Sequence, residues 1–200
     1  MYYINDYPID PNLKYLVYFR GNFGPPTKGH FSLVEHLINY PNVKYFIHQI
    51  GRRHGFPYQT NRKIFQIYLN PYKDRIILEK IGPSLDVLNY IDDVDKVILI
   101  RGAESEEPLT KRSGKEMFRD LRERYRPLGQ SLAKMKIKLD FLFVDRPLAN
   151  VLSATKFTEA LTLFYKTQKH ISQLRRFIPD HVNEDDFHYI IKKLCKTKTY

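Results

Sequence analysis

The chain has 200 residues, of which 42% are hydrophobic, and this length provides for one sizeable core but not for two large domains. No apolar stretch approaches the roughly 20 residues that span a bilayer, and a single cysteine, Cys195, excludes an internal disulfide and a cysteine-built zinc site. The N-terminus lacks the charged and apolar regions of a signal peptide, so we expect a cytoplasmic protein. The formal charge of +11 favours polyanionic partners such as nucleotides, with nucleic acid as a further possibility.

Five apolar, β-branched or aromatic runs are typical of buried strands, and helical patterns lie between most of them. The runs are Tyr15–Phe19, Val43–Ile50, Arg75–Leu78, Lys96–Ile100 and Leu139–Val144. Strands that alternate with helices are connected by crossovers and therefore pair in parallel. The sequence predicts an α/β fold, a Rossmann-like parallel five-stranded sheet flanked by helices.

The helices are expected where apolar residues recur at helical spacing. The first has one apolar face and ends before Pro41, the second spans about Asn61 to Leu69, and a third follows Pro83 and Ser84. Residues 104–138 are strongly charged, and we interpret them as an insertion with a helix near Gly114 to Arg126.

After the last strand, the spacing of Phe157, Leu161 and Phe164 indicates another amphipathic helix. Asn183 is suited to cap a final helix, which has acidic residues in its first turn. We therefore divide the chain into a Rossmann-like domain over residues 1–165, including the insertion, and a C-terminal helical extension over residues 166–200.

The most informative segment is the turn between the first strand and the first helix, residues 21–30, with the sequence GNFGPPTKGH. A glycine-rich turn at a helix start directs backbone N–H groups and the positive end of the helix dipole toward an anion. Thr27 and His30 are three residues apart on one helical face, so hydroxyl and imidazole converge above the turn. The spacing fits neither a P-loop nor the dinucleotide fingerprint, which leaves a different kind of phosphate site.

A second motif begins a helix after the last strand, with Ser153 as its expected N-cap and with Thr155 and Lys156 in the first turn. A lysine at a helix N-terminus opposes the helix dipole, at a cost of a few tenths of a kcal/mol unless an anion lies beside it. A solvated lysine that points outward is the alternative. The pattern favours a second contact to a polyphosphate.

Together the two motifs resemble those of the nucleotidyltransferase superfamily, which includes nicotinamide mononucleotide and phosphopantetheine adenylyltransferases and small cytidylyltransferases. Its first signature, G-x-F-x-P-x-[TH]-x-G-H, is matched by Gly21, Phe23, Pro25, Thr27, Gly29 and His30. Its second, S-[ST]-T-x-x-R, is similar to residues 153–158, with Thr158 in place of the arginine. The resemblance covers roughly residues 14 to 165 and implies a Rossmann-like transferase.

The resemblance also implies the reaction, in which a small phosphomonoester attacks the α-phosphorus of a nucleoside triphosphate, ATP favoured over CTP, and releases pyrophosphate. Such a reaction needs alignment and charge stabilisation rather than a general base. The implied catalytic residues are His30, Thr27 and Lys156. The implied nucleotide-binding residues are Gly21, Asn22, Phe23, Lys28, Gly29, Arg101, Gly102, Ser153 and Thr155, and weaker candidates for the acceptor phosphate are Arg52, Arg53 and Arg62.

We expect no dedicated metal site, because the sequence shows no carboxylate cluster. We expect Mg²⁺ to be held mainly by the triphosphate itself. We also expect a homo-oligomer. An adenylyltransferase similar to the nicotinamide mononucleotide enzymes is the favoured interpretation, and a cytidylyltransferase is the nearest alternative. A nucleic-acid-binding module that retains the scaffold without turnover is a third, supported by the positive charge and by Thr158.

Overall fold

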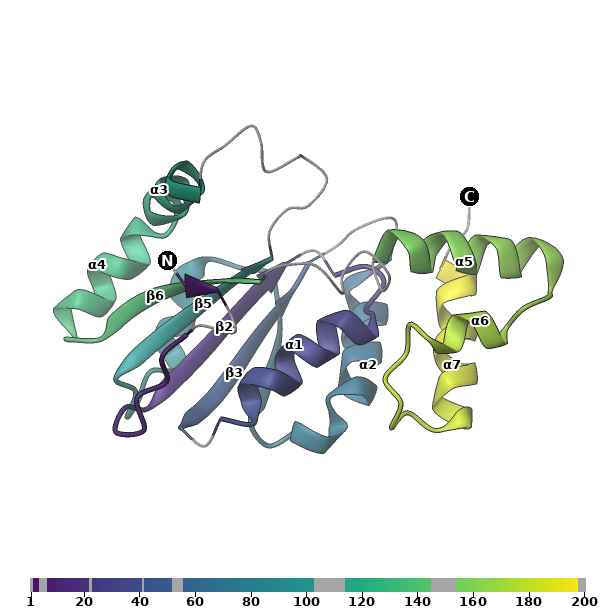
Figure 1. Cartoon of the computed structure of the whole chain (residues 1–200), viewed down its shortest axis with the longest axis horizontal. Coiled ribbons are helices and arrows are strands. Elements are labelled where there is room, and N and C mark those ends of the chain that lie inside the picture. The colour runs from purple at the N-terminus through teal and green to yellow at the C-terminus, as the bar shows by residue number, and fades with distance from the viewer. Residues whose placement is uncertain are drawn as a thin grey trace.

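The computed structural model describes residues 2–3, 7–21, 23–40, 42–51, 56–102, 114–144 and 154–197. Its centre is a parallel sheet of six strands in the order β1-β6-β5-β2-β3-β4 (Figure 1). The strands are β1 (Tyr2–Tyr3), β2 (Tyr15–Gly21), β3 (Val43–Ile50), β4 (Ile76–Lys80), β5 (Lys96–Gly102) and β6 (Lys138–Val144). The predicted α/β class and all five predicted strands are confirmed.

The strand that sequence analysis missed is β1, which pairs Tyr2 with Leu142 and Tyr3 with Phe143 at the edge of the sheet. Two residues are too few to show an alternating pattern, so no local signal identifies such a strand. The central strand β2 is recognisable for the opposite reason. Its residues from Tyr15 to Phe19 are all buried, because helices cover both faces of the sheet.

Helices α1 (Lys28–Ile38) and α2 (Tyr58–Tyr68) cover one face of the sheet. The four apolar residues expected on one face of the first helix are all buried: Phe31, Val34, Leu37 and Ile38. A short 3₁₀ helix, η2 (Asn70–Tyr72), follows α2 and leads into β4. The chain then crosses to the second face of the sheet.

The second face is covered by η3 (Ser84–Tyr90) and α4 (Arg126–Lys134). The element expected after Pro83 is thus a 3₁₀ helix, and the charged region contains two helices, α3 (Gly114–Arg124) and α4. Leu128 and Leu132 of α4 are buried in the core of this face. Part of the expected insertion therefore forms the helical crossover from β5 to β6.

Helices α5 (Ala154–Thr167), α6 (Ser172–Arg175) and α7 (Glu184–Thr197) gather at one end of the molecule (Figure 1). Asn183 caps α7 as expected, since its Oδ1 accepts the Asp186 N–H at 2.8 Å. Phe177 and Phe187 belong to the same core cluster as Phe19 and Phe46 of the sheet. Within the described ranges, no helix is both long and apolar enough to cross a membrane.

A row of polar side chains crosses three strands under η3. The hydroxyl of Tyr18 donates to Oε1 of Gln49 at 2.7 Å, and Nε2 of Gln49 donates to Glu79 at 3.3 Å. The hydroxyl of Tyr90 in η3 donates to the other oxygen of Glu79. Burial of the phenol raises the pKa of Tyr18 to about 12, so this hydroxyl keeps its proton and remains a donor.

Candidate functional site

The first motif lies where an open α/β sheet places its ligands. β2 pairs with β3 on one side and with β5 on the other, so the chain reverses its winding direction between β2 and β5. Ligands of such sheets bind outside the carboxyl ends of the strands at this switch point. Gly21 and Gly102, both predicted nucleotide-binding residues, end β2 and β5 there.

The turn is packed so closely that a side chain at residue 21 would force its neighbours to shift. A Cβ atom at Gly21 would lie 2.7 Å from the ring of Phe23, which is shorter than any ordinary contact. Phe23 is 5% exposed and makes edge contacts with Phe19 and Phe65, at centroid distances of 4.7 and 5.7 Å. The turn is therefore anchored to the core by an aromatic ring. The peptide bond between Gly24 and Pro25 is cis.

The geometry of Thr27 and His30 assigns the proton of the imidazole ring. Thr27 is the N-cap of α1, and its backbone N–H donates to Nδ1 of His30 at 3.1 Å. The Thr27 hydroxyl lies 3.1 Å from the same nitrogen. Because an N–H group can only donate, Nδ1 is the acceptor, and the neutral ring carries its proton on Nε2. His30 is thus built as a hydrogen-bond donor at the amino end of α1.

A second histidine, His48 on β3, lies directly behind this pair. Its ring is 0% exposed and lies 4.4 Å from Phe23 and 4.2 Å from Phe65, centroid to centroid. Among the residues that the structure describes, neither ring nitrogen has a hydrogen-bond partner, and the same holds for the side-chain amide atoms of buried Asn61. Burial holds the pKa of His48 well below its ordinary value, and repulsion from His30 in its protonated form acts in the same direction. His48 is therefore neutral at physiological pH.

Lys28 was predicted to contact the nucleotide, and in the structure it contacts the C-terminal extension instead. Its Nζ lies 2.5 Å from Oδ2 of Asp180, and its backbone N–H donates to the carbonyl of Phe177 at 2.6 Å. Consecutive helical residues point about 100° apart around the axis. Lys28 therefore lies off the face that Thr27 and His30 share.

The second motif is described from the start of α5 onward, with Thr155 half-buried and Lys156 exposed. Phe157, the next residue, stacks on Phe177 with the ring centroids 4.9 Å apart. Phe177 accepts the Lys28 N–H, so a single residue contacts both motif helices. The amino ends of α1 and α5 lie toward the same end of the sheet (Figure 1).

The remaining candidates are distributed as follows. Gly29 lies in the first turn of α1, Arg101 is next to last in β5, and Arg62 is exposed on α2. Four others, Asn22, Arg52, Arg53 and Ser153, lie outside the described residues. Among the residues that the structure describes, no group of three His, Cys, Asp or Glu side chains could hold a metal ion.

Arg20 is a cation that sequence analysis passed over. It is half-buried at the carboxyl end of β2, immediately before Gly21, and its charge acts to lower the pKa of Tyr18 against the larger effect of burial. The signal was present in the sequence, since a charged residue between a buried strand and a glycine turn is unusual. Its position at the switch point makes it a further candidate for phosphate contact.

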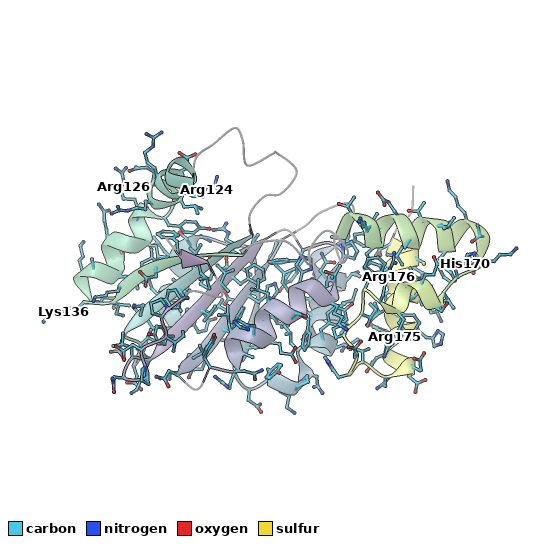
Figure 2. All side chains as sticks on the ribbon, in the orientation of Figure 1. Arg124, Arg126, Lys136, His170, Arg175 and Arg176 are labelled. Carbon is cyan, nitrogen blue, oxygen red and sulfur yellow. The ribbon has the colours of Figure 1, made fainter. Side chains whose placement is uncertain are left out.

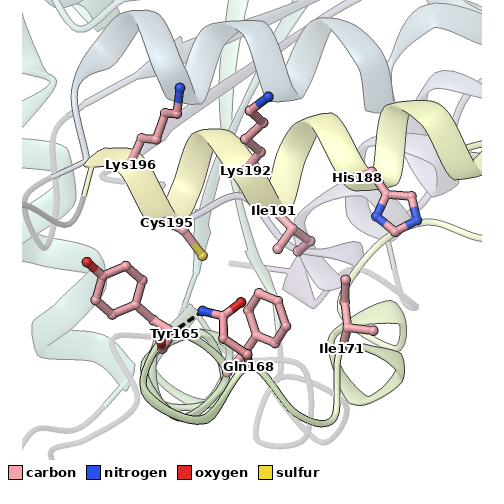
Figure 3. Close-up of a pocket in the computed structure, with 9 residues that line it drawn as sticks. Tyr165, Gln168, Ile171, His188, Ile191, Lys192, Cys195 and Lys196 are labelled. Atoms are coloured by element: carbon pink, nitrogen blue, oxygen red, sulfur yellow. Dashed lines mark hydrogen bonds between the residues drawn. The ribbon is translucent and has the colours of Figure 1, made fainter.

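A pocket of about 600 Å³ lies away from both motifs, between α5 and α7. In Figure 3, Ile191 and Cys195 face α5 across it, whereas Lys192 and Lys196 point away from α5. The amide of Gln168 donates to the carbonyl of Tyr165 at 3.0 Å along its rim. None of the predicted site residues lines this pocket, so we do not assign it to the nucleotide.

Comparison with solved structures identifies the fold. The chain is similar to nicotinic acid mononucleotide adenylyltransferase of Plasmodium falciparum complexed with APC, with a TM-score of 0.55, 16% identity, and 90% of this chain and 95% of that chain covered. The same enzyme complexed with NaAD matches with a TM-score of 0.53 and 14% identity over the same shares of both chains. No protein-family model matches the sequence, and no curated protein matches it significantly. The chain thus has the fold of a nucleotidyltransferase.

Proposed function

We propose that the protein is a nucleotidyltransferase that joins a nucleoside triphosphate, with ATP favoured, to a small phosphomonoester. The observation that carries the proposal is the bond from the Thr27 N–H to Nδ1 of His30. It leaves the Nε2 proton of His30 to donate toward a phosphoryl oxygen at the amino end of α1. The shared fold with an adenylyltransferase supports the same reaction class.

In the proposed reaction a phosphate oxygen of the acceptor attacks the α-phosphorus. The bond between the α-phosphorus and its bridge to the β-phosphate breaks, and pyrophosphate leaves with the electron pair. The nucleophile is already an anion, so no general base is required. The protein aligns the two phosphates and neutralises charge that develops at the α-phosphoryl oxygens, the role we assign to His30 and Thr27.

Hydroxyl groups and a lysine of the second motif extend the proposed site toward the leaving pyrophosphate. We assign Thr155, Lys156 and Ser153 to the β- and γ-phosphates, and Arg20 joins Arg101 as a candidate on the strand ends. Mg²⁺ would bind through the triphosphate and reduce its charge, because the described side chains offer no carboxylate cluster for a resident ion.

For the acceptor, we favour a pyridine mononucleotide, since the solved structures with the same fold are of a nicotinic acid mononucleotide adenylyltransferase. The test measures pyrophosphate release from ATP or CTP with nicotinic acid mononucleotide, nicotinamide mononucleotide or phosphopantetheine. Loss of one preorganised donor costs about 100- to 1,000-fold in turnover, which is the expected effect of His30→Ala. His36→Ala, an exposed histidine on the same helix, is the matched control. Equal turnover in both variants would contradict the role of His30.

Binding of nucleic acid is a second candidate function, favoured by the basic end of the molecule formed by α3 and α4. Exposed cations there are Arg119, Arg122, Arg124, Arg126, Lys134, Lys136 and Lys138, against the acidic Asp120 and Glu123. Figure 2 shows Arg124, Arg126 and Lys136 at this end. RNA affinity that falls steeply with salt, without pyrophosphate release from any substrate pair, would favour this candidate over the transferase.

A further inference from the structure

The segment between α6 and α7, residues 176–183, lies against the first turn of α1, and we call it the brace segment. Phe177, Ile178 and Val182 of this segment are buried, with exposures of 0, 0 and 2%. Arg175 stabilises the conformation of the brace segment, because the Nη2 of Arg175 donates to the carbonyls of Asp180, at 3.3 Å, and of Val182. The brace segment is therefore a fixed part of the fold.

Three contacts join the brace segment to α1. The Lys28 N–H donates to the Phe177 carbonyl at 2.6 Å, and the Lys28 Nζ lies 2.5 Å from the Asp180 carboxylate. One turn later, the rings of His181 and Phe31 lie 4.9 Å apart. The hydrogen bond from Lys28 lowers the pKa of Asp180, so the carboxylate stays charged at neutral pH.

A fourth contact joins the same segment to α5. The rings of Phe177 and Phe157 are stacked with an interplanar angle of 15°, and both are fully buried. Phe157 directly follows Lys156, whereas Lys28 directly follows Thr27. Phe177 thus touches both motif helices within one residue of the side chains assigned to the triphosphate.

We infer that the brace segment positions the two motif helices relative to each other, with Phe177 as a positioning residue and Lys28 as the anchor for Asp180 rather than a phosphate ligand. The inference rests on the proposed function, since alignment matters only if α1 and α5 hold one triphosphate. An error of about 1 Å in such alignment costs on the order of 100-fold in rate. The segment would therefore act on turnover more than on substrate affinity.

The test uses the full chain and three variants, Phe177→Leu, Asp180→Asn and Lys28→Met, with Asp185→Asn as the control that removes an exposed carboxylate from α7. We expect kcat to fall about tenfold in each of the three, with a smaller change in KM for ATP. Lys28→Met and Asp180→Asn should not add in the double variant, because each breaks the same contact. The control should behave as the wild type.

A second readout does not depend on turnover. Amide hydrogen exchange over residues 28–31 should accelerate about tenfold in Phe177→Leu and Asp180→Asn, since each variant weakens the packing or ion pair that holds the Phe177 carbonyl against the Lys28 N–H. Unchanged exchange in both variants would overturn the inference. So would a large rise in KM for ATP in Lys28→Met that Asp180→Asn does not share, because Lys28 would then contact the substrate.

The two proposals fail differently. If the wild type releases no pyrophosphate while the variants still accelerate exchange, the brace segment keeps its positioning role and the transferase proposal is lost. If the wild type turns over and the variants match it in exchange and in kcat, only the brace inference is lost.

Discussion

Replacing His48 with leucine should stabilise the protein, and increasingly so as the pH falls. Leucine is close to histidine in volume and removes two buried ring nitrogens that have no hydrogen-bond partner in the described part of the chain. Removing an unsatisfied buried polar group should stabilise the folded state by about 1–3 kcal/mol. Loss of the ring contacts to Phe23 and Phe65 should destabilise it by about 0.5–1.5 kcal/mol. We expect a net gain of about 1 kcal/mol in the free energy of unfolding near pH 7.5.

The pH dependence follows from the lowered pKa of His48. Below about pH 6.5 the unfolded chain binds a proton at this residue that the folded protein does not, so stability falls with falling pH. At about pH 5.5 the unfolded state gains RT ln 11, or about 1.4 kcal/mol, from this proton. The leucine variant has no such site, and its advantage should therefore grow to about 2.4 kcal/mol.

Urea unfolding of both proteins at the two pH values measures this difference, and every other titrating group cancels in the comparison. Unchanged m-values would show that the unfolded states are comparable. A leucine variant whose advantage is the same at both pH values would refute the assignment of His48 as a buried neutral imidazole. Loss of more than about 1 kcal/mol at the higher pH would show that its nitrogens have a partner.

Three further outcomes test the turn and the sheet. Gly21→Ala places a Cβ against the ring of Phe23 and should lower the free energy of unfolding by about 1–3 kcal/mol. It should also lower the affinity for ATP. An alanine variant as stable as the wild type would contradict the packing at this turn. Tyr18→Phe leaves the buried amide oxygen of Gln49 without its donor and should cost about 1–3 kcal/mol in urea unfolding, so a neutral effect would mean that the bond contributes little. Nitrogen NMR shifts should show His30 protonated on Nε2 at neutral pH, and the opposite tautomer would remove the basis of its donor role.

The sheet was predictable because its strands are long enough to show their character. Val43–Ile50 was predicted with the bounds that the structure has, since most of its residues are the β-branched and aromatic types that are common in buried strands. The edge strand Tyr2–Tyr3 was not, because it has only two residues and pairs with β6, which is distant in the sequence. The pattern of neighbouring residues in the sequence does not indicate a contact between distant segments.

The site was predictable in part, for reasons that differ by residue. Thr27 and His30 have a spacing that fixes their shared face, and the structure brings them within 3.1 Å. Helical geometry places Lys28 off the face that Thr27 and His30 share, and a short motif does not show which group the Lys28 side chain contacts. Its actual partner, Asp180, is far along the chain and has no signature of its own. His48 stands in an apolar strand, where sequence alone does not say whether its nitrogens find partners.

The hydrogen bonds that run from Tyr18 through Gln49 to Glu79 have a consequence for which folded state is reached. β4 lies at the edge of the sheet, and none of its residues is fully buried, so apolar contacts define its alignment only weakly. A shift of one position would turn Glu79 toward the apolar layer under α1 and α2, with no amide opposite it. The polar row therefore destabilises a shifted register of β4 on β3 and favours the register that the structure shows.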